Sequence, residues 1–210
     1  MRLAVALLLL VLPKVAGAVP PSPPPEAPRV SIERFAGRNI IVISGPIMEE
    51  TEAAFPLALA QAGARPLVFL DSPGGIIQSG VAIGRLIRAR GLQTVVPNRS
   101  ICFSACGLIW LAGEERWLGE GARVGFHAAS TAPPRGRGAG RVSSSGNALV
   151  GAYLGQLGLN DFQIGVLTEA SPGRMLELNS LRPGQLAELG IAYRRGMPSA
   201  PPRPGRISPK

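Results

Sequence analysis

The hydrophobic pattern between residues 29 and 196 alternates short β-branched runs with longer stretches in which apolar residues recur at helical spacing. The short runs predict strands at residues 30–35, 39–44, 66–70, 92–96 and 123–127. The longer stretches predict helices at residues 49–62, 75–91, 104–111, 148–157 and 161–169, and a last helix that ends within 186–191 before a short strand. Because strands alternate with helices, the pattern indicates an α/β fold with a mostly parallel sheet flanked by helices.

Three stretches depart from the regular pattern. Pro56 lies in the middle of the helix predicted at 49–62, and we expect it to kink this helix or delay its start. Residues 104–111 are apolar all round, so the helix there should be buried on all sides. Residues 130–145 are rich in Gly, Ser, Pro and Arg and fit neither period, so no regular element is expected there.

The N-terminal segment reads as a secretory signal peptide. Residues 1–18 contain Arg2, an apolar stretch at 3–12 that is too short to span a bilayer comfortably, and the small residues Ala16 and Ala18 at the end. A membrane anchor retained in the mature protein is the alternative. We therefore expect an exported protein, either periplasmic or secreted.

The rest of the chain divides into three parts. Residues 19–28 are rich in proline, which lacks an amide donor, and predict an extended linker. Residues 29–196 predict one folded domain, since the 192 residues left after cleavage at 18 suffice for a single core. Residues 197–210 predict a disordered, basic, Pro-rich tail.

The formal net charge of +9 falls to +7 when the signal peptide removes Arg2 and Lys14. A basic surface favours anionic partners such as membrane headgroups or cell-wall polymers, which makes peripheral membrane contact one interpretation. A solvated basic surface with no dedicated partner is the other. No aromatic residues interleave the arginines as in proteins that bind single-stranded nucleic acid, so we expect no nucleic-acid partner.

The candidate chemistry centres on a serine and the single histidine of the chain. Ser104 lies in the segment Cys-Phe-Ser-Ala-Cys, and His127 follows 23 residues later. A serine hydroxyl is a weak nucleophile until a neighbouring base takes its proton, and imidazole is the side chain best suited to this at neutral pH. Gly74 and Gly75 precede Ser104, and a glycine turn can direct amide groups at a developing oxyanion.

Together, Asp-Ser-Pro-Gly-Gly at residues 71–75, the segment around Ser104, and Gly-Phe-His ending at His127 resemble the proteolytic subunit of the Clp protease. More widely, they resemble the crotonase-like fold, and the resemblance covers residues 39–193. It implies a ClpP/crotonase-like spiral of ββα units and a bacterial-type serine protease that acts on a peptide or protein substrate and associates with copies of itself.

The resemblance also implies roles for individual residues. Ser104 would be the nucleophile, His127 the general base, and the Gly75 and Ala105 amides the oxyanion hole, with Gly74 at the substrate. A serine-lysine dyad, used by relatives of the same fold, is excluded because the mature chain has only Lys210.

The third member of a triad is not matched cleanly. The acidic position of the family aligns with Leu178, which is flanked by Glu177 and Asn179. Asp71 occupies a position where the family usually has Asn, and Asp161 lies too early in the chain. A Ser-His dyad, a triad completed by Asn179 and a triad completed by Glu177 all remain open.

Cys102 and Cys106 bracket the serine, and an exported chain would meet an oxidising compartment. Within a regular helix, side chains four residues apart are about 6 Å apart at Cβ, so a disulfide needs Cys102 outside the helix. Two buried thiols are the alternative. A cysteine nucleophile is disfavoured, because an exported thiol pair tends to oxidise. The chain lacks a ligand set for a metal, and no cofactor is expected.

Two functions fit these features. The first is an exported serine peptidase or hydrolase that works through an acyl-enzyme intermediate, with Ser104 attacking and His127 moving the proton. The alternative is a catalytically inactive ClpP-like fold that acts as a binding or scaffold protein in the envelope, favoured by the missing acid and the irregular segment at 130–145. Acyl-CoA chemistry is disfavoured, because an exported protein would not meet that cofactor.

Overall fold

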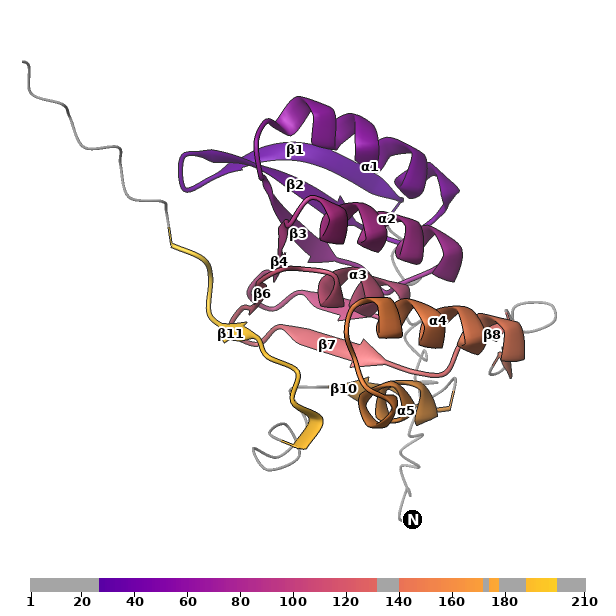
Figure 1. The fold of residues 1–210 in the computed structure, drawn as a ribbon. Coiled ribbons are helices and arrows are strands. Elements are labelled where there is room, and N and C mark those ends of the chain that lie inside the picture. The colour runs from indigo at the N-terminus through magenta and orange to yellow at the C-terminus, as the bar shows by residue number, and fades with distance from the viewer. Residues whose placement is uncertain (1–26, 132–139, 172–173, 178–187, 200–210) are drawn as a thin grey trace, which may run out of the picture.

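The computed structural model describes residues 27–131, 140–171, 174–177 and 188–199 (Figure 1). The predicted signal peptide, most of the linker at 19–28 and most of the tail at 197–210 lie outside the described residues. Among the described residues, no helix combines the length and the apolarity needed to cross a bilayer.

A six-stranded sheet has the order β1-β2-β3-β4-β6-β11. Its strands are β1 (Arg29–Phe35), β2 (Arg38–Ser44), β3 (Leu67–Asp71), β4 (Gln93–Val96), β6 (Arg116–Leu118) and β11 (Arg194–Arg195). β1 and β2 form an antiparallel hairpin, and every later pair of neighbours is parallel. β3 lies between β2 and β4 and is buried except at Asp71, so its carboxyl end, where the Gly-Gly turn begins, is firmly held.

A second sheet has the order β10-β7-β5 and carries the Ser104 region. Its strands are β5 (Ile101–Phe103), β7 (Arg123–Phe126) and β10 (Leu176–Glu177). β5 runs parallel to β7, and β10 runs antiparallel to it. A parallel bridge between Ser72 and Cys102 joins the chain after β3 to β5. The second sheet therefore starts where β3 ends, which brings the Gly-Gly turn beside the end of β5.

Five helices with described bounds pack against these sheets: α1 (Glu49–Ala62), α2 (Ile77–Ala89), α3 (Ala105–Leu111), α4 (Ser144–Gln156) and α5 (Asp161–Glu169). Every residue of α3 is buried, and α2 contacts both α3 and α4 (Figure 1). The main core lies between the helices and the sheets. Successive residues of a strand face opposite sides, so Ile41 and Ile43 enter this core while Ile40 joins a smaller cluster on the other face of the sheet.

The predicted fold class is confirmed, and the five predicted strands lie within one residue of β1, β2, β3, β4 and β7. The helices predicted at 49–62 and 161–169 coincide with α1 and α5, and the buried helix predicted at 104–111 is α3. Of the predicted last helix, residues 188 and 189 are helical in the described part, and the short strand after it is β11.

One expectation about elements was wrong, and another was wrong in one of its two alternatives. α1 begins at Glu49, so Pro56 does not delay its start, and buried side chains such as Phe55 and Leu59 hold the helix despite one lost hydrogen bond. The stretch 130–145 is not irregular throughout, since β8 (Ser130–Thr131) and β9 (Arg141–Val142) pair as an antiparallel hairpin.

Within the same stretch, α4 begins at Ser144, four residues before the predicted start. The Ser143 hydroxyl caps this helix by accepting a hydrogen bond from the Gly146 amide at 3.1 Å. The short strands β5 and β6 were not predicted, because three residues are too few to show a period.

Candidate active site

Ser104 occupies a sharp turn between β5 and α3, with backbone angles of φ 55° and ψ −121°. Residues other than glycine rarely adopt such a positive φ, which costs about 1–3 kcal/mol. The Ser104 amide donates to the Gly125 carbonyl at 2.9 Å, which fixes the turn against β7. Within the described part of α3, the Ser104 hydroxyl accepts no capping hydrogen bond, so the helix start does not occupy Oγ.

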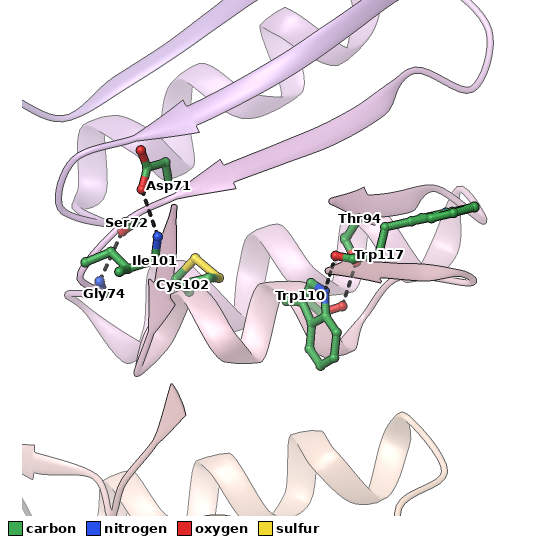
Figure 2. The surroundings of a disulfide bond; sticks show 9 residues. Asp71, Ser72, Gly74, Thr94, Ile101, Cys102, Trp110 and Trp117 are labelled. Atoms are coloured by element: carbon green, nitrogen blue, oxygen red, sulfur yellow. Dashed lines mark hydrogen bonds between the residues drawn. A yellow bond between two sulfur atoms is a disulfide. The ribbon is translucent and has the colours of Figure 1, made fainter. Parts of the chain in front are cut away.

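The Gly-Gly turn lies directly against the Ser104 turn. A Cβ added to Gly74 would stand 2.8 Å from Ser104 Cβ and 2.5 Å from the Phe103 carbonyl oxygen, so only glycine permits this approach. Gly74 has a φ of 97°, and its amide donates to Ser72 Oγ at 3.0 Å. Figure 2 shows Ser72 and Gly74 beside Ile101 and Cys102. The structure therefore brings together the two motifs that the sequence places thirty residues apart.

The Gly75 and Ala105 amides border the same turn. The Ile47 amide donates to the Gly74 carbonyl, and the Ile47 carbonyl accepts from Ile76, both at 2.8 Å. In a parallel bridge of this kind the amide of the central residue, Gly75, points away from Ile47. Ala105 is the first residue of α3, and an amide in the first turn has no acceptor within its own helix.

His127 follows directly after β7 and is half-buried. Its Nδ1 lies 2.7 Å from the Ala128 carbonyl oxygen. A carbonyl oxygen can only accept, so in the neutral imidazole this contact requires the hydrogen on Nδ1 and leaves the lone pair on Nε2. This is the tautomer that a general base acting through Nε2 requires.

Ser104 and His127 line one small cavity of about 20 Å³. The rest of the lining is apolar and comes from α2, α3, α4, α5 and the chain around β7: Ile77, Ala105, Leu108, Phe126, Ala129, Val150, Leu154 and Leu167. The serine hydroxyl and the imidazole are thus the polar side chains of an apolar cavity.

Glu177, one candidate for the third member of a triad, is bound to Arg123. Arg123 Nε donates to Glu177 Oε2 at 2.7 Å, and a second guanidinium nitrogen donates to Oε1. The hydrogen bond from Arg123 and its positive charge hold the pKa of the Glu177 carboxyl below its ordinary value, against the smaller opposing effect of burial. Glu177 pairs with Gly125 across β10 and β7, so this ion pair fastens β10 to β7.

The other acidic or amide candidates have separate positions. Asn179 and Leu178 lie outside the described residues. Asp71 Oδ1 accepts a hydrogen bond from the Ile101 amide at 3.1 Å, which ties β3 to β5 (Figure 2). Asp161 is the first residue of α5. The partner that the structure gives to His127 Nδ1 is thus the Ala128 carbonyl, a backbone group that sequence reasoning had no means of identifying.

Cys102 and Cys106 form a disulfide, with 5.0 Å between their Cα atoms. Cys102 lies in β5 and Cys106 in α3, so the first cysteine is outside the helix, as bridging requires. Because both sulfurs are consumed by the bond, neither carries the thiolate that a cysteine nucleophile needs. Within the described parts of the chain, no group of three or more His, Cys, Asp and Glu residues is placed to hold a metal ion.

Sequence reasoning missed the groups that surround the predicted pair. The pocket walls contributed by α4 and α5, such as Val150, Leu154 and Leu167, carry only an ordinary apolar pattern. Nothing in the sequence around Arg123, apart from its positive charge, indicated that it binds Glu177. The elements that contribute these side chains are brought to Ser104 by the fold, and no local motif marks them.

No protein-family model matches the sequence, and no curated protein sequence matches it. Solved structures are similar in fold. A serine-to-alanine mutant of the 1510-N membrane-bound stomatin-specific protease matches with a TM-score of 0.56 and 16% identity, over 74% of this chain and 77% of its own. ClpP1 from Listeria monocytogenes matches with a TM-score of 0.52 and 20% identity, over 73% of this chain and 88% of its own.

An enzyme of CoA chemistry is similar as well. Methylmalonyl CoA decarboxylase, in complex with 2S-carboxypropyl CoA, matches with a TM-score of 0.50 and 10% identity, over 79% of this chain and 67% of its own. Sequence identities of 20% and below show a shared fold, so the activity has to be argued from the site. Taken with the sheet order and the packing of the helices, these matches establish that the chain has the ClpP/crotonase-like fold.

Proposed function

We propose that this chain is a serine peptidase, or more generally a serine hydrolase, with Ser104 as nucleophile and His127 as general base. The observation that carries the proposal is that the strained Ser104 turn and His127 line the same apolar pocket. Strained backbone at a polar side chain in a pocket is a recurrent feature of catalytic sites. The hydrogen bond from His127 Nδ1 to the Ala128 carbonyl supports the role of Nε2 as the proton acceptor.

The reaction would follow the acyl-enzyme route. Ser104 Oγ attacks the carbonyl carbon of the substrate while His127 Nε2 takes the hydroxyl proton. The negative charge that develops on the substrate oxygen is stabilised by the amides of Gly75 and Ala105. His127 then gives the proton to the leaving amine, the C–N bond breaks, and water hydrolyses the acyl-enzyme through the same base.

In this proposal a hydrogen bond to a backbone carbonyl orients His127, so a Ser-His dyad suffices. Ala128 would supply that carbonyl, and neither Glu177 nor Asn179 is required. An orienting group raises activity, but part of the rate enhancement survives its loss.

The pocket also suggests a substrate preference. Its wall beyond Ser104 and His127 is apolar, so a charged side chain entering it would lose hydration without gaining a partner. We infer that the substrate residue before the scissile bond is small and apolar, since the cavity measures about 20 Å³. Peptides that differ only at this residue test the inference: Ala should be cleaved in preference to Asp or Lys, and an equal rate for all three would contradict it.

Export is part of the same proposal and rests on residues 1–18. Intact mass of the chain recovered from a bacterial host tests it: loss of these residues is expected, and their retention contradicts cleavage at this site. Self-association rests on the resemblance to the Clp protease subunit, and contact with anionic headgroups rests on the net charge of +7 that remains without Arg2 and Lys14. Sedimentation of the purified protein, alone and with anionic vesicles, measures both.

Covalent labelling by a fluorophosphonate tests the chemistry itself. The wild type should be labelled, and Ser104→Ala should not be labelled because it lacks the attacking oxygen. His127→Gln keeps a polar side chain but cannot take the proton, so its labelling should slow by about 10²- to 10⁴-fold. A folded wild type that does not react would instead support the non-catalytic binding or scaffold role.

A further inference from the structure

The disulfide spans the turn that carries Ser104. Cys102 lies two residues before the serine in β5, and Cys106 lies two residues after it in α3. Both cysteines are fully buried. The covalent bond therefore closes a loop of five residues with the proposed nucleophile at its centre.

The two ends of this loop are anchored to different parts of the molecule. On the strand side, the Phe103 amide donates to the Ser72 carbonyl at 3.0 Å, next to the bridge between Ser72 and Cys102. On the helix side, α3 packs against α2 and is buried along its whole length. The disulfide joins these two anchors by a second covalent path, besides the backbone that runs through the strained residue.

The start of α3 is where this link matters most. Ser104 is the N-cap residue, but its hydroxyl makes no capping hydrogen bond in the described helix. A hydroxyl that attacks a substrate cannot also be committed to the helix, so catalysis removes the usual stabilisation of a helix start. The Cys102–Cys106 bond holds the same first turn without using the serine oxygen.

We infer that the Cys102–Cys106 disulfide is a positioning element of the active site, and that closing it brings Ser104 into reactive geometry. This inference rests on the proposed function. Without the bond, only hydrogen bonds and packing maintain the positive φ of Ser104, and the turn can relax toward ordinary backbone angles. The reduced chain then keeps its fold but reacts slowly, so activity depends on a compartment in which the bond forms.

The redox step balances as a thiol–disulfide exchange. Closing the bond transfers two electrons and two hydrogens from the Cys102 and Cys106 thiols to a disulfide oxidant, which becomes two thiols. A small dithiol reverses the step and becomes a cyclic disulfide. Because both sulfurs are buried, exchange needs the turn to open, so the closed bond is protected from passing thiols.

The test compares the kinetics of fluorophosphonate labelling in matched proteins. Cys102→Ala/Cys106→Ala removes the bond and leaves no thiol. Leu59→Ala in α1 is the control, since it weakens the core with a side chain that does not line the pocket. Thermal unfolding monitors the stability of all three proteins. We expect the maximal labelling rate of the double variant to fall at least tenfold with little change in the probe concentration for half-saturation, while Leu59→Ala labels at the wild-type rate.

A second measurement, on the wild type, tests the inference if the double variant does not fold. Wild type is reduced with dithiothreitol, its two free thiols are confirmed by intact mass, and labelling is followed before reduction, after it and after reoxidation. Loss and recovery of the rate support the inference. An unchanged rate in reduced protein, or in the folded double variant, overturns it. Failure of the oxidised wild type to label overturns the proposed function instead.

Discussion

At the scale of single residues, the site depends on which hydrogen bonds each polar group already makes. Ser104 leaves its hydroxyl out of the start of α3, and His127 uses Nδ1 on the Ala128 carbonyl. Ser104 Oγ and His127 Nε2 are thereby left for the proposed reaction. Both residues could be named as candidates from the sequence, since His127 is the single histidine and Ser104 follows a glycine turn at the spacing of a known motif.

Glu177 contributes at this scale as half of an ion pair with Arg123. The hydrogen bond from Arg123 is the main cause that holds the pKa of Glu177 below its ordinary 4.5. A carboxyl whose pKa is lowered by folding stabilises the protein above its unfolded pKa, and this contribution is lost as the pH falls through the folded pKa.

We expect Glu177→Gln to lower the thermal midpoint slightly at pH 7, because the neutral amide cannot replace a charge-assisted pair. The difference from wild type should shrink as the pH falls below 4.5 and disappear below the lowered pKa of the folded protein, where the wild-type carboxyl is also neutral. Thermal unfolding of both proteins across this pH range measures the effect. A difference that stays constant with pH would mean that Glu177 acts through packing.

At the scale of elements, the site forms where β3 and β5 end side by side. The Ser72–Cys102 bridge aligns the two chain segments, and Gly74 then lies against Ser104. The motif order implied that these segments meet. The strand that carries them together, β5, was not predicted, because three residues show no period and its pairing with β7 is a long-range contact.

We expect Gly74→Ala to lower reactivity of Ser104 by tenfold or more and to destabilise the fold by about 1–3 kcal/mol. The added Cβ would meet Ser104 Cβ at 2.8 Å, and the φ of 97° disfavours any side chain. Gly155→Ala in α4 is the matched control: nothing lies within 4 Å of its added Cβ, and alanine favours the helix interior by about 0.5–1 kcal/mol. Labelling rates and urea unfolding of both variants separate the two outcomes; equal labelling rates would argue against close contact between the turns.

At the scale of the whole molecule, one core joins the helices that build the pocket. Tyr153 on α4 is fully buried and donates its hydroxyl to the Leu108 carbonyl of α3 at 3.0 Å. It also packs against Gly84 of α2, where no side chain would fit. Tyr153 therefore ties α4 to the two helices that hold the Ser104 turn.

Burial raises the pKa of Tyr153 above its ordinary 10.0, outweighing two nearby arginines that lower it. Because its pKa is higher in the folded than in the unfolded chain, the contribution of the neutral Tyr153 to the free energy of unfolding is complete below pH 10.0. It is lost as the pH rises above that value, where the unfolded tyrosine ionises first.

We expect Tyr153→Phe to cost about 1–3 kcal/mol at pH 7, since the Leu108 carbonyl loses its donor. Its stability should then fall less steeply than that of wild type above pH 10.0. Chemical denaturation of both proteins at pH 7 and above pH 10.0 measures the free energy of unfolding, and an equal loss in the two proteins would contradict this expectation.

The sequence by itself determined the α/β class and the bounds of most of the longer elements, and it marked Gly74, Ser104 and His127 as candidate site residues. These follow from local properties: the period of apolar positions, the freedom of glycine and the chemistry of particular side chains. Only the tertiary structure decided that the Ala128 carbonyl holds His127, that Glu177 binds Arg123, and that helices from the second half of the chain wall the pocket. It also decided that Cys102 and Cys106 are bridged, because the bond depends on a strand ending beside a helix start. Backbone acceptors and long-range contacts leave no mark in a residue pattern, since any residue type can supply them.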